Sequence, residues 1–271
     1  MNNQFYLSLL ADPVTKKPVD ASAFSNINGV IDARIFLKNT YGFNDWFDGQ
    51  VSYEKLVSKS SSNLLAEIEN YRTEIKFDRP IYEHYRMNGR ILDVGGSWGT
   101  VREFLPKDIH FISIDPFINC LNEISKSRYE AYACLSQPLN FIAATAEFLP
   151  FVSESFDWIH MRSMIDHVQV PDLALMEARR VLKPDGRILI GLYVDGGKSG
   201  IISSKERIKN KIKQVLESVG IDHWKDHHIW HPTYKGLCKL IVDNGFEIED
   251  VYWQPRHVDK VCYISAYKVK I

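Results

Sequence analysis

The sequence has few of the features that mark exported, thiolate-metal or membrane-spanning proteins. Its 271 residues include only 4 cysteines, and none of these stands in a Cys-x-x-Cys pair. Neither a disulfide framework nor a thiolate zinc site is therefore expected. The first residues, "MNNQFYLSLLADP", carry no basic segment, and no apolar run approaches the length of about 20 residues that a membrane helix needs. We expect a cytoplasmic protein with no membrane span.

An excess of charge of either sign is also lacking. Lys and Arg number 33 against 34 Asp and Glu, which gives a formal net charge of -1. This balance gives no reason to expect a nucleic acid as partner. The hydrophobic share of 45% and the charged share of 25% are ordinary for a globular protein.

What the sequence does contain is a regular alternation of strand-like and helix-like segments from residue 90 onward. The apolar runs are nearly continuous, as in strands that are buried on both faces, and the clearest helix between them covers 172–182. We predict an α/β fold with a doubly wound, mostly parallel, seven-stranded sheet of Rossmann-like type, whose last strand is antiparallel. The strands are expected at 90–94, 109–114, 140–144, 156–161 and 187–194, followed by "FEIEDVYWQP" and "KVCYISAYKV".

The chain divides by composition into an appendage and a main domain. Residues 1–60 consist of short apolar pieces broken by turn-forming segments, which predicts a small N-terminal appendage before a main domain at 61–271. Within the main domain, a basic amphipathic helix at 203–219 and a histidine-rich stretch suggest a lid-like insertion at about 195–232.

The segment "ILDVGGSWGT" at 91–100 has two interpretations. Gly95 to Gly99 fits the Gly-x-Ser-x-Gly elbow of serine hydrolases, with Ser97 as nucleophile. That elbow normally follows several strands, whereas this segment lies on the first strand of the alternating region. The other interpretation is a glycine loop after an acidic strand, and "FISIDP" supports it, because Asp115 ends the next strand where a carboxylate can hold the two hydroxyls of a ribose.

Four segments in this order resemble a known family. "ILDVGGSWGT", "FISIDP", "AATAEFLPF" and "EARRVLKPDGRILIGLY" resemble the class I S-adenosylmethionine-dependent methyltransferases, in particular the type-11, ubiquinone-biosynthesis-like subgroup. The resemblance implies S-adenosyl-L-methionine as cofactor. It implies that the glycine loop contacts the methionine part of the cofactor and that Asp115 contacts the ribose. Residues 145–147 would contact the adenine, and the end of the fourth strand would lie beside the sulfonium. The residues implied are Asp93, Gly95, Gly96, Ser97, Gly99, Asp115, Pro116, Thr145, Ala146, Glu147, Met161 and Arg162.

Two positions depart from the family pattern. Ser97 stands where the family usually has glycine, and we expect binding to survive if the backbone there avoids a positive φ. Thr145 stands where an aspartate commonly receives the adenine amino group, and a threonine hydroxyl can accept a weaker hydrogen bond.

Histidines supply the candidate bases. His167 follows the fourth strand, and His231 lies in "DHWKDHHIWHP"; either could remove a proton from the acceptor or be merely structural. A metal site in this histidine-rich stretch is a rival interpretation, but the spacing imposes no ligand geometry, so no metal is expected. We predict methyl transfer to a small molecule, at oxygen rather than nitrogen or carbon. The alternatives are a regulatory S-adenosylmethionine-binding protein without turnover and a serine hydrolase that uses Ser97.

Overall fold

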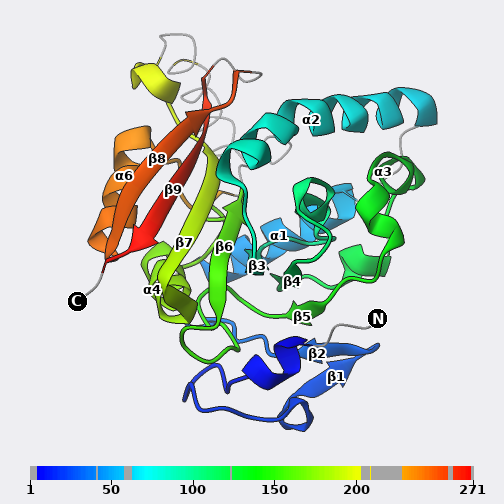
Figure 1. The fold of residues 1–271 in the computed structure, drawn as a ribbon, viewed down its shortest axis with the longest axis vertical. Coiled ribbons are helices and arrows are strands. Elements are labelled where there is room, and N and C mark those ends of the chain that lie inside the picture. The colour runs from blue at the N-terminus through cyan, green and yellow to red at the C-terminus, as the bar shows by residue number, and fades with distance from the viewer. Residues whose placement is uncertain are drawn as a thin grey trace.

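A computed structural model describes residues 5–40, 42–57, 63–122, 124–202, 208, 228–255 and 259–269. Within these residues, nine strands form one sheet in the order β1-β2-β5-β4-β3-β6-β7-β9-β8. Figure 1 shows this sheet running through the molecule, with α4 (Pro171–Val181) and α6 (Tyr234–Asp243) at one side of it and α2 (Leu64–Tyr85) above. The strands are β1 (Ser25–Ile27), β2 (Val30–Asp32), β3 (Arg90–Val94), β4 (His110–Asp115), β5 (Phe141–Ala143), β6 (Phe156–Arg162), β7 (Leu182–Tyr193), β8 (Phe246–Trp253) and β9 (Val261–Lys268).

The central strands are parallel and the C-terminal ones are not. β5, β4, β3, β6 and β7 pair in parallel, whereas β9 lies antiparallel between β7 and β8. The predicted doubly wound α/β class and the antiparallel last strand are therefore confirmed. The short link between β8 and β9 explains this direction, because a parallel pair needs a crossover of a dozen or more residues.

The predicted strand count of seven is too low. The two additional strands, β1 and β2, come from the N-terminal appendage, and β2 pairs in parallel with β5 through Ile31 and Ile142. Each has three residues, which is too short to show the period-two alternation by which a strand is recognised in a sequence. The appendage also reaches the core directly, since Leu10 forms a bridge with Phe151 and both side chains are buried.

Both faces of the sheet are covered, because successive strand residues point to opposite sides. In β3, Leu92 packs in a core cluster that includes Leu175 of α4 and Leu237 of α6, whereas its neighbour Ile91 packs in a second cluster with Ile81 of α2. The helices are α1 (Phe43–Val57), α2 (Leu64–Tyr85), α3 (Lys126–Ala131), α4 (Pro171–Val181) and α6 (Tyr234–Asp243), with 3-10 turns η1 (Phe5–Leu9), η2 (Ala21–Ala23), η3 (Thr100–Phe104), η4 (Asn119–Asn122), η5 (Ala133–Ser136) and η6 (Gly197–Ser199).

Helix α2 is a single helix of 22 residues that precedes β3. Asn63 caps its first turn by accepting a hydrogen bond from the Ala66 N–H. Pro80 removes one backbone donor from the helix interior. The helix continues past Pro80, because Ile81 and Tyr82, which follow it, are buried in the core. Their burial stabilises the fold by more than the missing hydrogen bond destabilises it.

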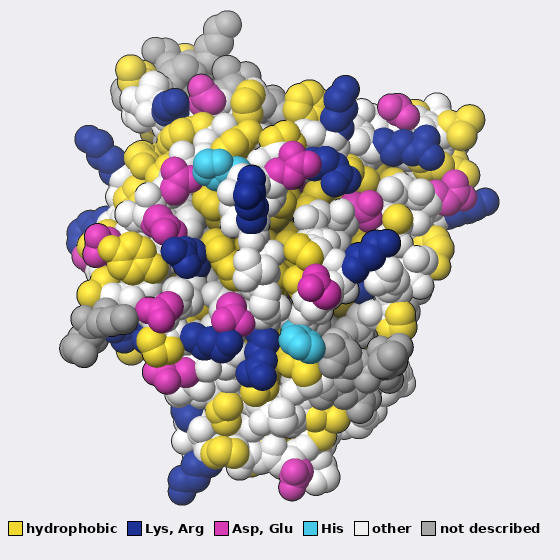
Figure 2. All heavy atoms as spheres, viewed as in Figure 1, with side chains coloured by type: hydrophobic (Ala, Val, Ile, Leu, Met, Phe, Trp, Pro, Cys, Tyr) yellow, Lys and Arg dark blue, Asp and Glu magenta, His cyan; other side chains and the backbone are white. Residues whose placement is uncertain are grey.

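The predicted helix at 203–219 falls outside the described residues except for Ile208, and so do His223, Asp226 and His227. No helix in the described part of the chain is both long and apolar enough to cross a membrane. On the face drawn in Figure 2, the described basic and acidic side chains are interspersed and form no large patch of a single sign.

Candidate functional site

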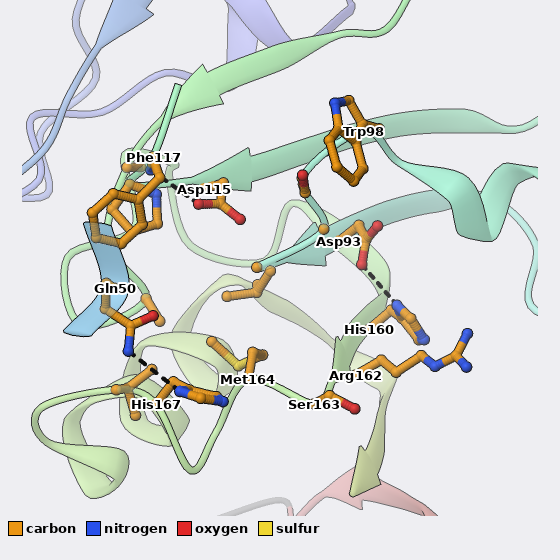
Figure 3. A pocket seen from close by; sticks show the side chains of 18 of the residues that line it. Gln50, Asp93, Trp98, Asp115, Phe117, His160, Arg162, Ser163, Met164 and His167 are labelled. Carbon is orange, nitrogen blue, oxygen red and sulfur yellow. Dashed lines mark hydrogen bonds and ion pairs between the residues drawn. The ribbon is translucent and has the colours of Figure 1, made fainter. Parts of the chain in front are cut away.

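A cavity of about 390 Å³ opens where the parallel strands β3, β4, β5 and β6 end (Figure 3). Open α/β sheets bind their ligands in the crevice outside the carboxyl ends of the strands, and the volume suits a small molecule. Most of the predicted site residues meet in the lining of this pocket. They are Asp93, Gly95, Gly96, Ser97, Asp115, Pro116, Thr145, Ala146, Glu147, Arg162 and His167.

The glycine loop after β3 is folded tightly against the next strand. The N–H groups of Gly95 and Gly96 both donate to the Ile114 carbonyl oxygen at the end of β4. A Cβ at Gly96 would lie 2.1 Å from Asp93 Oδ2 and 2.5 Å from the Ser113 hydroxyl, so no larger residue fits there. The loop therefore brings bare backbone to the pocket, as a ligand that is held by main-chain groups requires.

Gly99 closes this loop but is absent from the pocket lining among the described residues. It has a φ of 63° and precedes η3, and a Cβ on it would meet the side chains of Leu139 and Phe111. Its part is to turn the chain into η3 rather than to face a ligand.

Cofactor binding was expected to survive serine at position 97 if the backbone there avoids a positive φ. Ser97 has a φ of 44°, so this condition is not met. A residue with a Cβ in this left-handed region destabilises the folded state by roughly 1–2 kcal/mol.

We expect Ser97→Gly to be more stable than Ser97→Ala by about 1 kcal/mol, because both lack the hydroxyl and only alanine keeps the strain. Urea unfolding of the two variants measures this difference. Equal unfolding free energies would show that the loop relaxes around the Cβ.

Asp93 is held by a buried chain of hydrogen bonds that the sequence analysis did not identify. Its Oδ1 lies 2.7 Å from His160 Nδ1, and His160 Nε2 lies 3.1 Å from the Tyr82 hydroxyl. Burial raises the pKa of Tyr82, so this phenol stays neutral and can donate to the imidazole. The parallel register places Asp93 directly beside His160 on neighbouring strands, which fixes the carboxylate at the pocket edge.

Asp115 ends β4 at the top of the pocket in Figure 3. Its Oδ1 accepts a hydrogen bond of 2.9 Å from the Phe117 N–H, which orients the carboxylate. The next residue, Pro116, accepts from the Arg34 guanidinium at 3.1 Å, and Arg34 in turn pairs with Asp32 at 2.8 Å. The N-terminal appendage therefore supports the backbone that presents Asp115.

Thr145 and Glu147 follow β5 and are both buried. The Thr145 hydroxyl donates to the Ile35 carbonyl oxygen at 2.9 Å, so toward the pocket its oxygen can act only as an acceptor. One oxygen of Glu147 accepts from the backbone N–H groups of Gln169 and Val170, just before α4. Burial raises the pKa of Glu147, although these backbone hydrogen bonds act to lower it.

The end of β6 sends alternate residues to opposite faces. Arg162 lines the pocket and lies 2.6 Å from Asp78 of α2 in an ion pair. Met161 was expected to edge the pocket, but it is fully buried in the core, because a neighbour of Arg162 in a strand must point to the other face. Met164, in the loop after β6, takes the place at the pocket.

Helix α1 contributes a part of the pocket that no sequence motif indicated. Trp46 and Gln50 both line it, and Trp46 Nε1 donates to the His167 carbonyl oxygen at 2.5 Å. The Trp46 ring also lies 6.4 Å from the ring of Phe117, within an aromatic group that includes Phe36 and Phe47. The N-terminal appendage thus forms one wall of the pocket.

His167 faces the pocket from the side opposite Asp93 and His160 (Figure 3). Its Nδ1 lies 3.3 Å from the Gln50 side-chain nitrogen, and its ring lies 4.3 Å from that of His228. His231 does not belong to the pocket lining that the described residues form; it is exposed, with its ring 5.4 Å from that of His228. Of the two predicted bases, the structure places only His167 at the pocket.

Comparison with known proteins supports the fold and gives the domain that contains the pocket. Residues 92–190 match the family model described as a methyltransferase domain, and this range contains the glycine loop, Asp115 and His167. The ubiquinone/menaquinone biosynthesis C-methyltransferase UbiE of Rickettsia prowazekii is 29% identical over 208 residues, which cover 71% of this chain and 81% of that protein. In sequence and in fold the chain is similar to the class I S-adenosylmethionine-dependent methyltransferases.

This methyltransferase takes S-adenosylmethionine as its cofactor, as the type-11 subgroup does. Another relative, the O-methyltransferase rstn1 of Aspergillus nomiae, is 35% identical over 111 residues, covering 40% of this chain and 48% of that one. A solved structure of the 1,6-didemethyltoxoflavin-N1-methyltransferase of Burkholderia thailandensis shares the fold with a TM-score of 0.52, at 15% identity over 89% of this chain and 94% of that chain. Its crystals hold 1,6-didemethyltoxoflavin and S-adenosylhomocysteine.

Proposed function

We propose that this methyltransferase transfers the methyl group of S-adenosylmethionine to an oxygen of a small molecule. The observation that carries the proposal is one pocket with Asp93 and Asp115 on one side and an imidazole, His167, on the other. Two carboxylates suit the cationic and hydroxylated parts of the cofactor. A histidine suits an acceptor that must lose a proton.

The residues around the pocket match the parts of the cofactor. Asp115, oriented by Phe117, would accept hydrogen bonds from the two ribose hydroxyls. Thr145 offers only an acceptor, which matches a donating adenine amino group. Asp93 and the bare backbone of Gly95 and Gly96 would hold the methionine part. Glu147 would shape the adenine end, with one carboxylate oxygen held by the Gln169 and Val170 N–H groups just before α4.

When bound, the cofactor supplies a methyl group on a sulfonium, whose carbon–sulfur bond breaks as the carbon–oxygen bond to the acceptor forms. The protein contributes position and proton removal. Pocket walls from α1 and from the loop after β6 orient the acceptor, and such positioning is worth on the order of 7–11 kcal/mol in favourable cases. His167 takes the hydroxyl proton, with Gln50 beside its ring to hold the imidazole. Hydroxyl acceptors fit this arrangement better than carbon acceptors, although the relatives' names include both.

Isothermal titration with S-adenosylmethionine and S-adenosylhomocysteine tests the cofactor half of the proposal. We expect one site per chain for each ligand, with micromolar or tighter affinity. Incubation with S-adenosylmethionine and a panel of hydroxylated, amino and carbon-acid metabolites then tests the acceptor half. Product from hydroxylated compounds is expected, and methylation confined to amines or carbon acids would contradict it.

Two other functions have specific observations behind them. A binding protein without turnover is favoured by the left-handed Ser97 and by Thr145, and it predicts binding of S-adenosylhomocysteine without any product from the panel. A serine hydrolase is favoured by the Gly-x-Ser-x-Gly match, and it predicts that a fluorophosphonate probe labels Ser97. The cytoplasmic location and the division at residue 60, with a lid at about 195–232, stay predictions.

A further inference from the structure

Three potential metal ligands from two distant segments meet at the wall of the pocket. Asp166 and His167 belong to the loop after β6, and His228 precedes α6. One ligand atom of each lies within 4.8 Å of those of the other two. A backbone hydrogen bond of 2.9 Å from the Ile229 N–H to the Asp166 carbonyl oxygen joins the two segments, so the main chain itself holds the three residues together.

The carboxylate of Asp166 is the second observation that points to a cation. Asp166 is only 7% exposed, and its Oδ2 lies 3.5 Å from His228 Nε2. Its Oδ1 is buried and has no hydrogen-bond partner among the described residues. A buried carboxylate oxygen without a partner destabilises the folded state, more so when it is charged, and a bound cation removes this cost.

Gln50 stands where metal sites commonly hold the residue that orients a histidine ligand. Its carboxamide lies 3.3 Å from His167 Nδ1. The oxygen and nitrogen of an amide are assigned from the hydrogen-bond network, so the carboxamide can equally present its oxygen to an Nδ1–H group. That arrangement would leave the other ring nitrogen of His167 unprotonated and able to ligate.

We propose that Asp166, His167 and His228 bind a divalent transition-metal ion of the zinc class. Two imidazoles and one carboxylate are the ligands that such an ion prefers, whereas magnesium prefers oxygen ligands alone. Three protein ligands leave a further position for a group that enters from the pocket, which His167 lines.

This site deepens the proposed function and rests on it for its chemistry. An ion next to the acceptor hydroxyl would lower the pKa of that group, and its proton would pass to water. His167 is then a ligand, whereas in the metal-free protein it is the base. The substrate class that follows is a hydroxylated compound able to approach a metal ion with its reacting oxygen.

Direct titration of the metal tests the site without an activity assay. The full-length protein, dialysed against EDTA and then freed of it, is titrated with ZnCl₂, with MgCl₂ for comparison, and with CoCl₂ to follow the visible absorption of bound cobalt. We expect one Zn²⁺ per chain at micromolar or tighter affinity, and weaker Mg²⁺ binding. His228→Ala and Asp166→Asn should each weaken Zn²⁺ binding by about 10–100-fold or more.

A matched control uses a different histidine–carboxylate pair, which lies near the surface. His84 Nε2 lies 2.6 Å from Asp250 Oδ2, and His84→Ala should leave Zn²⁺ affinity unchanged. His228 is exposed, so His228→Ala keeps a test available if Asp166→Asn does not fold. Wild-type Zn²⁺ affinity in His228→Ala, or no Zn²⁺ binding by the wild-type protein, would overturn the proposal.

Titration of the same proteins with S-adenosylhomocysteine separates this inference from the proposed function. His228 is not part of the described pocket lining, so His228→Ala should bind S-adenosylhomocysteine as the wild type does. Cofactor binding without Zn²⁺ binding would reject the metal site alone. Zn²⁺ binding without cofactor binding would support the site and reject the proposed function.

Discussion

Replacement of His167 by alanine is expected to lower the turnover number of the metal-free enzyme by about 10²–10⁴-fold, the usual contribution of a positioned general base. His167 is the histidine that faces the pocket across from Asp93, and it is backed by Gln50 of α1. The affinity for S-adenosylhomocysteine should change by less than about threefold, because His167 acts on the acceptor and not on this product of the cofactor. The measurements are the rate with an acceptor from the panel and a titration.

The pH dependence of the rate distinguishes a base from a structural histidine. An acceptor hydroxyl ionises unaided as the pH rises, so the deficit of His167→Ala should shrink at alkaline pH. A variant that had merely lost its fold would show no such recovery. His84→Ala serves as the control, since His84 pairs with Asp250 near the surface and is not part of the described pocket lining. Rates within threefold of the wild type in His167→Ala would remove His167 from the reaction.

The parts of the fold that the sequence predicted are those with a strong local pattern. β3, β4, β6 and α4 begin and end within one or two residues of the expected bounds, because each is an apolar run or an amphipathic repeat of sufficient length. β1 and β2 lacked such a pattern, and the pairing of β2 with β5 joins residues more than a hundred positions apart in the chain. A long-range contact of this kind leaves no periodicity in the sequence.

The same distinction holds within the candidate site. The motif residues Asp93, Gly96 and Asp115 were predicted, because a tight loop and a strand end each have a local signature. His160 was missed, although the register of β3 and β6 would have placed it beside Asp93 once the two strands were taken as neighbours. Trp46 gave no signal at all, since its position depends on how α1 packs over the sheet.

The strongest test of the cofactor site is Asp115. Asp115→Ala is expected to weaken S-adenosylhomocysteine binding by about 100-fold, because each hydrogen bond to a charged group contributes roughly 1.5–3 kcal/mol, and about 3 kcal/mol corresponds to that factor. The exposed Asp108, in the turn before β4, provides a control, and Asp108→Ala should bind as the wild type does. Isothermal titration of the three proteins measures the difference.

Asp115 also accepts a hydrogen bond from the Phe117 N–H, so the alanine variant changes the loop as well as the ligand contact. Asp115→Asn keeps an acceptor for Phe117 and removes only the charge and one acceptor oxygen, and it should weaken binding by about tenfold or more. An analogue of S-adenosylhomocysteine that lacks both ribose hydroxyls completes the argument. Wild type and Asp115→Asn should bind this analogue almost equally, because the contact that distinguishes them is gone. An unchanged ratio of affinities would show that Asp115 acts through the loop and not on the ribose.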